Sequence, residues 1–320
     1  MAHLRKYGAA ILLSCIPIIA FLFLNLPLNR QLNVAAAHAE EKPPEPLHVR
    51  IKYLFGFNGR ASGLPFGWVN RIMFDNNRGE VYLLDSDNQR VVITNMGGIF
   101  LYQFKFAEAN IQSPTSMIID PQTGNILMGE GSRVAVLDYK GRYKRDIDLS
   151  GIPDKDKDLD IQSIALDKQG NIYMGGRGRV EVVSQDGRFI REIGKKQGMG
   201  NNIKGMYVDE GEITFLDPAG FSVMRFSIEG KFLSKFGNIS SLLGGFSQPT
   251  DMAVYEKKKR IIVVDNNRTV VIGFDWEGNP LFEFGGPEMF RWPRAVGVNK
   301  DGHIYVADNT GVIRVFEVIE

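Results

Sequence analysis

The sequence predicts an all-β protein, a six-bladed β-propeller preceded by an N-terminal transmembrane or signal helix. Three observations lead there: a long apolar run near the N-terminus, a phrase of short apolar strands that recurs after residue 70, and a repeat length of about 45 residues. They divide the chain into a signal peptide or signal anchor at residues 1–39, a linker at 40–46 and the propeller at 47–320. The composition is globular, with 44% hydrophobic and 23% charged residues.

The N-terminal segment predicts export. Residues 8–28 contain only Ser14 and Asn25 as polar residues, and at about 1.5 Å per residue a helix of this length spans a bilayer core. Arg5 and Lys6 precede the run, so the positive-inside rule places the N-terminus in the cytoplasm. The body is therefore expected to be extracytoplasmic, which means periplasmic in a Gram-negative cell.

Two fates of this segment remain open. Residues 37–39 (AHA), followed by Glu40, have the small-x-small form of a signal-peptidase site, which predicts cleavage after Ala39. Without cleavage, residues 8–28 would anchor the protein in the inner membrane and give it a membrane contact. The Pro-rich, charged residues 40–46 (EEKPPEP) predict an extended linker.

Charge and cysteine content exclude several function classes. Residues 1–39 hold three of the 38 cations and none of the 37 acids, so residues 40–320 carry 35 cations and 37 acids. A slightly acidic body lacks the basic surface that nucleic-acid binding needs, so no nucleic-acid partner is expected. The single cysteine, Cys15, excludes an internal disulfide framework and a zinc site with several thiolate ligands.

Internal repetition predicts the propeller. Each repeat has a short strand, a Gly or Asn turn, a second apolar strand that ends in a polar residue, a polar turn, a third strand and a Gly turn. The residues that end the second strands are Asp85, Glu130, Gly176, Asp217, Asp265 and Asp308. Their spacing is typical of propeller blades, and six such units fill residues 47–320. The acids among them are expected to cap turns by accepting hydrogen bonds from loop amides.

Closure of the ring follows from its two ends. The last repeat stops after its third strand, at residues 312–318, whereas residues 49–56 (VRIKYLFG) form a strand without a neighbour. Pairing these two segments completes the sixth blade and removes an exposed sheet edge.

The repeat resembles the NHL repeat. Residues 301–308 (DGHIYVAD) carry its Gly-x-Ile-Tyr-Val-x-Asp phrase, and Asp85, Asn88 and Arg90 are similar to the family's strand-end Asp and following Asn and Arg. Glu130 and Gly176 depart from the pattern. The resemblance implies a propeller fold, but the superfamily includes protein-binding, RNA-binding, lyase and lactonase propellers, so it leaves the function open.

The starts of the first strands predict the lining of the central channel. Two successive rings are candidates, and either could face the axis; they are Asn70, Thr115, Gln162, Lys204, Thr250 and Arg294, and Arg71, Ser116, Ser163, Gly205, Asp251 and Ala295. Because cations exceed acids here, the channel suits an anion or a polar ligand, with a water-filled channel as the alternative. The candidate binding residues are Asn70, Arg71, Lys204, Asp251 and Arg294.

The loops between blades give a second candidate site, which we call the loop face. They carry Trp68, Phe246, Phe290 and Trp292 beside the starts of first strands, and such aromatic residues commonly anchor interfaces. The alternative is that these side chains fill gaps between blades.

The predicted function is an exported binding or scaffold propeller that presents its loop face to a protein or to a polymer such as a glycan. The alternative is a small-molecule hydrolase or lyase, lactonase-like, at the channel mouth. The chain has only four histidines, at positions 3, 38, 48 and 303, so it lacks the histidine set on which related lyases depend. No catalytic residue, metal ligand or cofactor is assigned.

Overall fold

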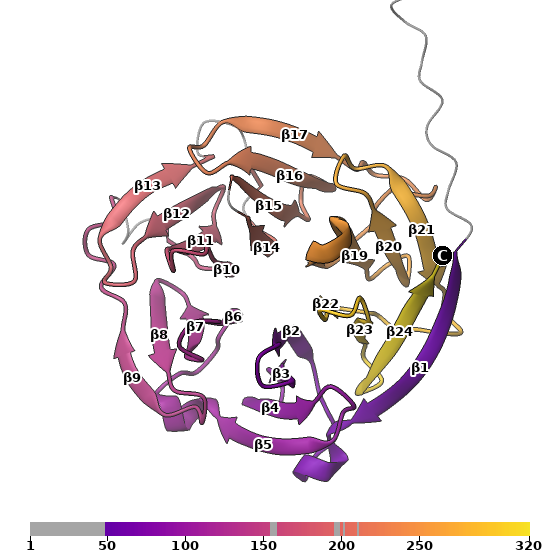
Figure 1. The fold of residues 1–320 in the computed structure, drawn as a ribbon, viewed down its shortest axis with the longest axis horizontal. Helices are drawn as coiled ribbons and strands as arrows, with labels where there is room; N and C mark the ends of the chain where they lie inside the picture. The colour runs from indigo at the N-terminus through magenta and orange to yellow at the C-terminus, as the bar shows by residue number, and fades with distance from the viewer. Residues whose placement is uncertain (1–48, 154–158, 195–198, 201, 210) are drawn as a thin grey trace, which may run out of the picture. The chain divides into compact units, whose positions relative to one another are not determined.

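The computed structural model describes residues 49–153, 159–194, 199–200, 202–209 and 211–320. They form six four-stranded antiparallel sheets around a central axis, which confirms the six-bladed propeller (Figure 1). The predicted leader, residues 1–39, and the linker, residues 40–46, lie outside the described residues. Within the described ranges, no helix is long and apolar enough to cross a membrane.

Each blade runs outward from an inner strand that lines the axis. The inner strands are β2 (Val69–Asp75), β6 (Ser116–Ile119), β10 (Ser163–Leu166), β14 (Lys204–Val208), β18 (Pro249–Tyr255) and β22 (Ala295–Val298). The second strands are β3 (Glu80–Asp85), β7 (Ile126–Glu130), β11 (Ile172–Gly176), β15 (Glu212–Asp217), β19 (Arg260–Asp265) and β23 (Ile304–Ala307).

Two further strands complete each blade on the outside. The third strands are β4 (Arg90–Asn95), β8 (Arg133–Leu137), β12 (Arg179–Val183), β16 (Ser222–Ser227), β20 (Val270–Phe274) and β24 (Val312–Ile319). The outer strands are β5 (Phe100–Lys105), β9 (Tyr143–Asp146), β13 (Phe189–Ile193), β17 (Phe232–Phe236), β21 (Pro280–Gly285) and β1 (Arg50–Asn58). Short 3-10 turns are η1 (Gly59–Ser62), η2 (Phe106–Ala109) and η3 (Glu256–Lys258).

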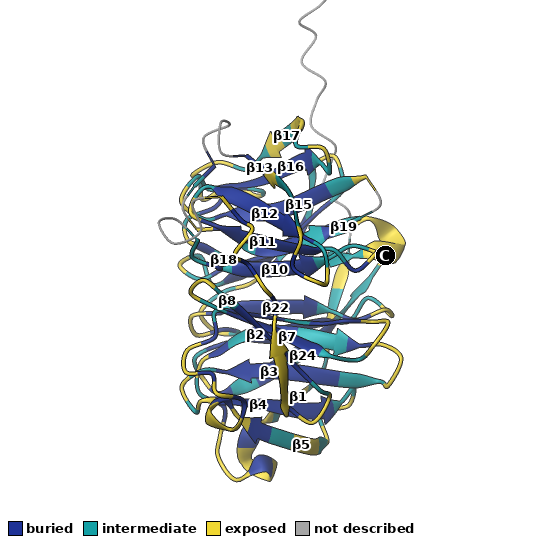
Figure 2. Ribbon diagram, turned by 90° about the vertical axis from the view of Figure 1, so that its left-hand side faces the viewer, coloured by how far each residue is buried: buried dark blue, intermediate teal, exposed yellow. Residues whose placement is uncertain are grey.

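The core lies between neighbouring blades. Second and third strands are buried on both faces because each blade packs against the next, so they consist of nearly continuous apolar runs. Tyr82 and Leu84 of the first blade, for example, share a cluster with Met117 and Met128 of the second. Outer strands are far more exposed: every residue of β9 is exposed, and β1 is largely exposed at the periphery (Figure 2).

The ring closes as predicted, by pairing the first described strand with the last. Strand β1 runs antiparallel to β24, from the Arg50–Ile319 pair to the Asn58–Val312 pair, with a bulge between Tyr53 and Phe55. The closing strand extends two residues beyond the predicted end at residue 56. The sixth blade therefore has four strands, like the other five, and β1 covers the edge that β24 would otherwise expose.

The acids that end second strands cap loops, as predicted. The Asp85 carboxylate accepts hydrogen bonds from the Gly67 amide at 3.0 Å and from the Arg90 side chain at 2.8 Å. Asp265 accepts from the amides of Gln248 and Arg268 at 3.1 and 2.9 Å. Each acid thus fixes the loop that leads into its blade, which places the start of the inner strand.

Gly176 departs from this pattern for a steric reason. The Asp160 carbonyl oxygen approaches so closely that a Cβ at position 176 would lie 1.8 Å from it. Backbone contact therefore takes the place of the capping carboxylate in the third blade, and only glycine leaves room for it.

Candidate functional site

Most residues of the two predicted rings line the channel, at successive levels, whereas Gln162, Ser116 and Ala295 line neither of its two cavities. The inner strands begin on the loop face, and their first residues surround a cavity of about 490 Å³ that we call the polar mouth. Ring residues that line it are Asn70, Thr115, Lys204, Thr250 and Arg294, and the loops add the amides of Gln89, Gln112, Asn202 and Gln248.

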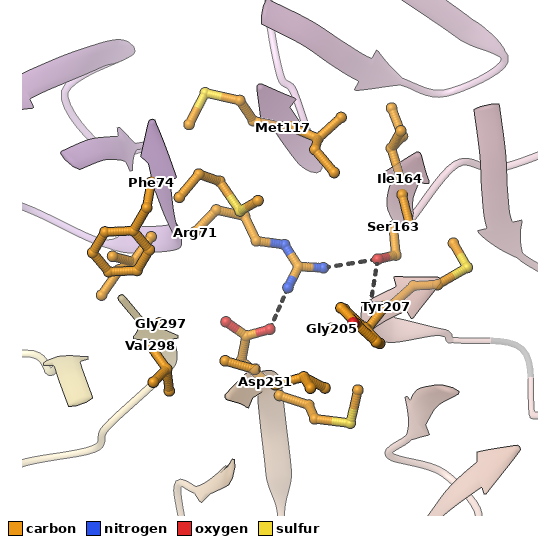
Figure 3. Close-up of a pocket in the computed structure, with 18 of the residues that line it drawn as sticks. Arg71, Phe74, Met117, Ser163, Ile164, Gly205, Tyr207, Asp251, Gly297 and Val298 are labelled. Carbon is orange, nitrogen blue, oxygen red and sulfur yellow. Dashed lines mark hydrogen bonds and ion pairs between the residues drawn. The ribbon is translucent and has the colours of Figure 1, made fainter. Parts of the chain in front are cut away.

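The next level crosses the channel. Arg71 extends from β2 to the middle of the ring, where it forms an ion pair with Asp251 of β18 and donates to Ser163 Oγ of β10 at 3.2 Å (Figure 3). All three side chains are buried. Blades one, three and five therefore meet in one buried polar contact at the axis.

The same level also ties each inner strand to the next. Side-chain oxygens accept hydrogen bonds from backbone amides of the neighbouring blade: Ser116 Oγ from Ile164 at 2.9 Å, Ser163 Oγ from Met206 at 3.1 Å and Asp251 Oδ2 from Val296 at 3.2 Å. At Gly205, φ is +51° and a Cβ would lie 2.5 Å from the Met252 carbonyl oxygen, so glycine permits the close approach of β14 to β18.

Arg71 divides the channel into two cavities, because its side chain lines both. The second cavity, about 290 Å³, opens on the opposite face, where the inner strands end. We call it the apolar mouth; its walls include Met73, Phe74, Met117, Ile118, Ile119, Leu166, Tyr207, Val254 and Val298. This cavity was not predicted from the sequence, because the candidate ring residues are the first residues of each inner strand and most of its walls come from the ends of those strands.

The polar mouth carries excess positive charge. Lys204 Nζ donates to Gln162 Oε1 at 3.1 Å, and burial, followed by the nearby Arg71 charge, lowers the pKa of Lys204 to about 8. Burial also lowers the pKa of Arg294, and it raises the pKa of Asp251 against the opposing effect of Arg71. Arg71 is paired with Asp251, whereas neither Lys204 nor Arg294 forms an ion pair among the residues described. Acids act on these two cations only through longer-range charge interactions, from Asp251 and Asp160 on Lys204 and from Asp87 on Arg294.

We expect Lys204 to titrate near pH 8 in the folded protein and near about 10.4 in the unfolded chain. Between these values the unfolded chain binds more protons at this position, so the contribution of Lys204 makes stability rise with pH. The measurement is a ¹³Cε NMR titration of lysine-labelled protein, with Lys204→Arg to assign the signal. A Lys204 midpoint above pH 10 in the folded state would contradict the burial effect.

The loop-face candidates do not lie together, and the prediction is wrong for two of them. Phe246 and Phe290 are buried, with Phe246 packed against Phe274 and Phe290 against Phe284 and Phe316. Each phenylalanine fills the space between two adjacent blades, Phe246 between the fourth blade and its own and Phe290 between the fifth blade and its own.

Trp68 and Trp292 are exposed, at 42% and 54%. Arg294 lies over the Trp68 ring at 3.8 Å, and Arg291 lies 5.9 Å from the Trp292 ring. Asn309 links the two loops, because its side chain accepts from Trp68 Nε1 at 3.0 Å and its amide donates to the Arg291 carbonyl at 2.9 Å. We call these two tryptophans and two arginines the rim patch.

Trp292 has an unusual backbone. Its φ is +54°, a left-handed conformation that is costly for a bulky residue, yet its ring is half exposed. Packing alone would favour glycine here.

Side chains that could hold a metal ion or act as histidine acid–base groups are scarce among the described residues around the two mouths. Over the described ranges, no three His, Cys, Asp or Glu side chains are placed to hold a metal ion. His303 lies between β22 and β23 and lines neither mouth.

Comparisons with known proteins show the fold and no family. No family model matches the chain, and no curated protein sequence does. Among solved structures, a catalytically inactive histidine-to-alanine variant of virginiamycin B lyase from Staphylococcus aureus, with quinupristin, is similar with a TM-score of 0.54. The two share 14% identity over 78% of this chain and 80% of that chain, which shows the propeller fold alone. Membership of the NHL family stays a prediction.

Proposed function

We propose that the protein is an exported binding propeller whose loop face holds an acidic glycan, with an acidic residue of the polymer in the polar mouth. The observation that carries the proposal is that two cations, Lys204 and Arg294, line a cavity of about 490 Å³ and form no ion pair among the described residues. Among the described lining residues of this cavity there is no carboxylate. A carboxylate ligand would form charge-assisted hydrogen bonds with both cations.

The remaining lining favours a sugar over a simple ion. Asn70, Thr250 and the loop amides of Gln112, Asn202 and Gln248 offer both donors and acceptors, as a ring of hydroxyl groups requires. Such a mixture of polar groups around a cavity of this size fits a ligand with many hydrogen-bonding groups.

The rim patch extends the site beyond the mouth. Trp68 lies beside Arg294, and Asn309 connects the loops of Trp68 and Trp292, so both indole rings are candidate contacts for a polymer that extends out of the mouth. The exposed indole ring of Trp292 offers a flat apolar surface, which suits the face of a sugar ring, and Trp68 offers the ring face that Arg294 does not cover. A protein with an acidic segment is the other partner class for the same face.

Export rests on the leader alone. The apolar residues 8–28, with Arg5 and Lys6 before them, support an extracytoplasmic location, with residues 8–28 as a membrane anchor if the leader is retained. A glycan partner is consistent with that location.

The enzymatic alternative, a hydrolase or lyase at the channel mouth, has weaker support. The lyase neighbour is only 14% identical, and neither mouth is lined by a described histidine.

The test compares an oligogalacturonate with its carboxyl-reduced, neutral form by isothermal titration calorimetry on the full-length protein. We expect only the acidic form to bind, more weakly at high salt and above pH 8, where Lys204 loses its charge. Lys204→Met and Arg294→Met should each weaken binding at least about tenfold, since each removes one charge-assisted contact.

Lys257→Met is the matched control. Lys257 is an exposed cation in η3, on the opposite face, so its loss changes the net charge equally but leaves the polar mouth intact. Equal binding of the neutral oligosaccharide, or equal losses in all three variants, would refute the proposal. Capture of an acidic peptide but no acidic glycan would assign the face to a protein partner.

A further inference from the structure

The apolar mouth is a second cavity, separate from the proposed glycan site. It opens on the opposite face and ends at the buried Arg71–Asp251 pair (Figure 3). Its volume, about 290 Å³, is near the lower end of the range for small-molecule sites. A cavity of this volume suits a small ligand.

The walls are built to contact an apolar body. The ends of all six inner strands supply them, and Met117, Met206 and Met252 are among the side chains around the cavity. Methionine side chains adapt to irregular apolar ligands because they are unbranched and polarisable. Phe74, which packs edge-on against Tyr305 at 5.0 Å, adds a rigid aromatic wall.

The floor offers hydrogen-bond donors in excess. A guanidinium has five N–H groups, and Arg71 gives two of its bonds to Asp251 and Ser163. Ser163 Oγ accepts from Arg71 and from the Met206 amide, which leaves its hydroxyl proton to donate. Asp251 already accepts from Arg71 and from the Val296 amide. The floor can therefore donate hydrogen bonds to an acceptor oxygen of a ligand.

Charge favours an anionic acceptor. Arg71 and Asp251 cancel each other, and Lys204 lies close enough for both charges to affect its pKa. An added carboxylate would thus meet a net positive field. At the outer edge, Glu256 would repel the same group, which orients an acid with its head inward.

We propose that the apolar mouth binds a small apolar carboxylic acid, with its carboxylate on Arg71 and Ser163 and its apolar body against the inner-strand ends. The site shares Arg71 with the polar mouth but lies on the other face. It stands or falls independently of glycan binding.

The test uses octanoate and 1-octanol, which have the same chain and different heads. We expect octanoate to bind at least tenfold more tightly, as measured by calorimetry on the full-length protein. In methyl-labelled methionine NMR spectra, octanoate should shift the Met117 and Met206 signals. The Met224 signal, from a buried residue outside the cavity lining, should not move.

A cavity-filling variant gives the control. Val298→Trp enlarges a partly exposed wall residue and should abolish octanoate binding, whereas Ile99→Trp, in an exposed turn, should leave it unchanged. Unmoved Met117 and Met206 signals, or equal affinity for the alcohol, would overturn the proposal. The two ligands are compared on the unmodified protein, so that result does not depend on whether a variant folds.

Discussion

Deletion of residues 50–58, strand β1, is expected to lower the free energy of unfolding by about 4 kcal/mol or more. The deletion removes the whole outer strand of the sixth blade and uncovers the edge of β24. It also removes the packing of Tyr53 on Phe316 and of Phe57 on Phe66. Urea unfolding measures the loss, and sedimentation measures association through the new edge.

Lys52→Ala is the control for this deletion. Lys52 lies on the same strand, but its ion pair with Glu317 is exposed, and such pairs contribute about 1 kcal/mol or less. The closure argument fails if the deleted protein unfolds at the same urea concentration as the intact one and remains monomeric.

Phe290→Ala is expected to cost about 3 to 5 kcal/mol of stability, because it opens a cavity beside Phe284 and Phe316. Trp292→Ala, two residues along the same loop, should change stability by less than about 1 kcal/mol, since its ring is half exposed. Trp292→Gly should be neutral or stabilising because glycine accepts the positive φ. Thermal and urea unfolding of the three variants measure these changes in stability.

Because Phe290 and Trp292 lie in the same loop, the comparison is not affected by where in the propeller a residue lies. Similar losses for Phe290→Ala and Trp292→Ala would show that both rings fill the gap between blades. The rim patch would then lose its binding role.

The fold was predictable because its signals are local and repeated. Each strand-end acid, such as Asp85 or Asp265, caps the loop that precedes its own blade, so the same turn requirement recurs in every repeat except the third, where Gly176 stands. Closure followed from a strand count, because the last repeat lacked its outer strand and the N-terminal part of the propeller held one strand without a partner.

The site was only partly predictable. Asn70 and Arg71 are adjacent, and a flat strand would point them to opposite sides, yet both line the channel. A register shift between Val69 and Arg71 in the β2–β3 pair accounts for this. Such a bulge leaves no clear mark in the sequence.

Burial of the loop aromatics was equally hidden. Phe290 and Trp292 stand two residues apart in one loop, and a positive φ at Trp292 separates their directions. The sequence shows both as aromatic residues before a first strand, and only the backbone distinguishes the buried one from the exposed one.

The seam between β1 and β24 also sets the order in which the chain can fold. Lys52 and Glu317 pair across 265 residues, whereas the strands of the first five blades pair with neighbours in sequence. At roughly 5–20 residues per second, the ribosome needs tens of seconds to make the partner of β1 after β1 itself. During that time the first strand is available to other chains and to chaperones. The ring can therefore close only after β24 has been synthesised, and until then β1 can pair with the wrong partner.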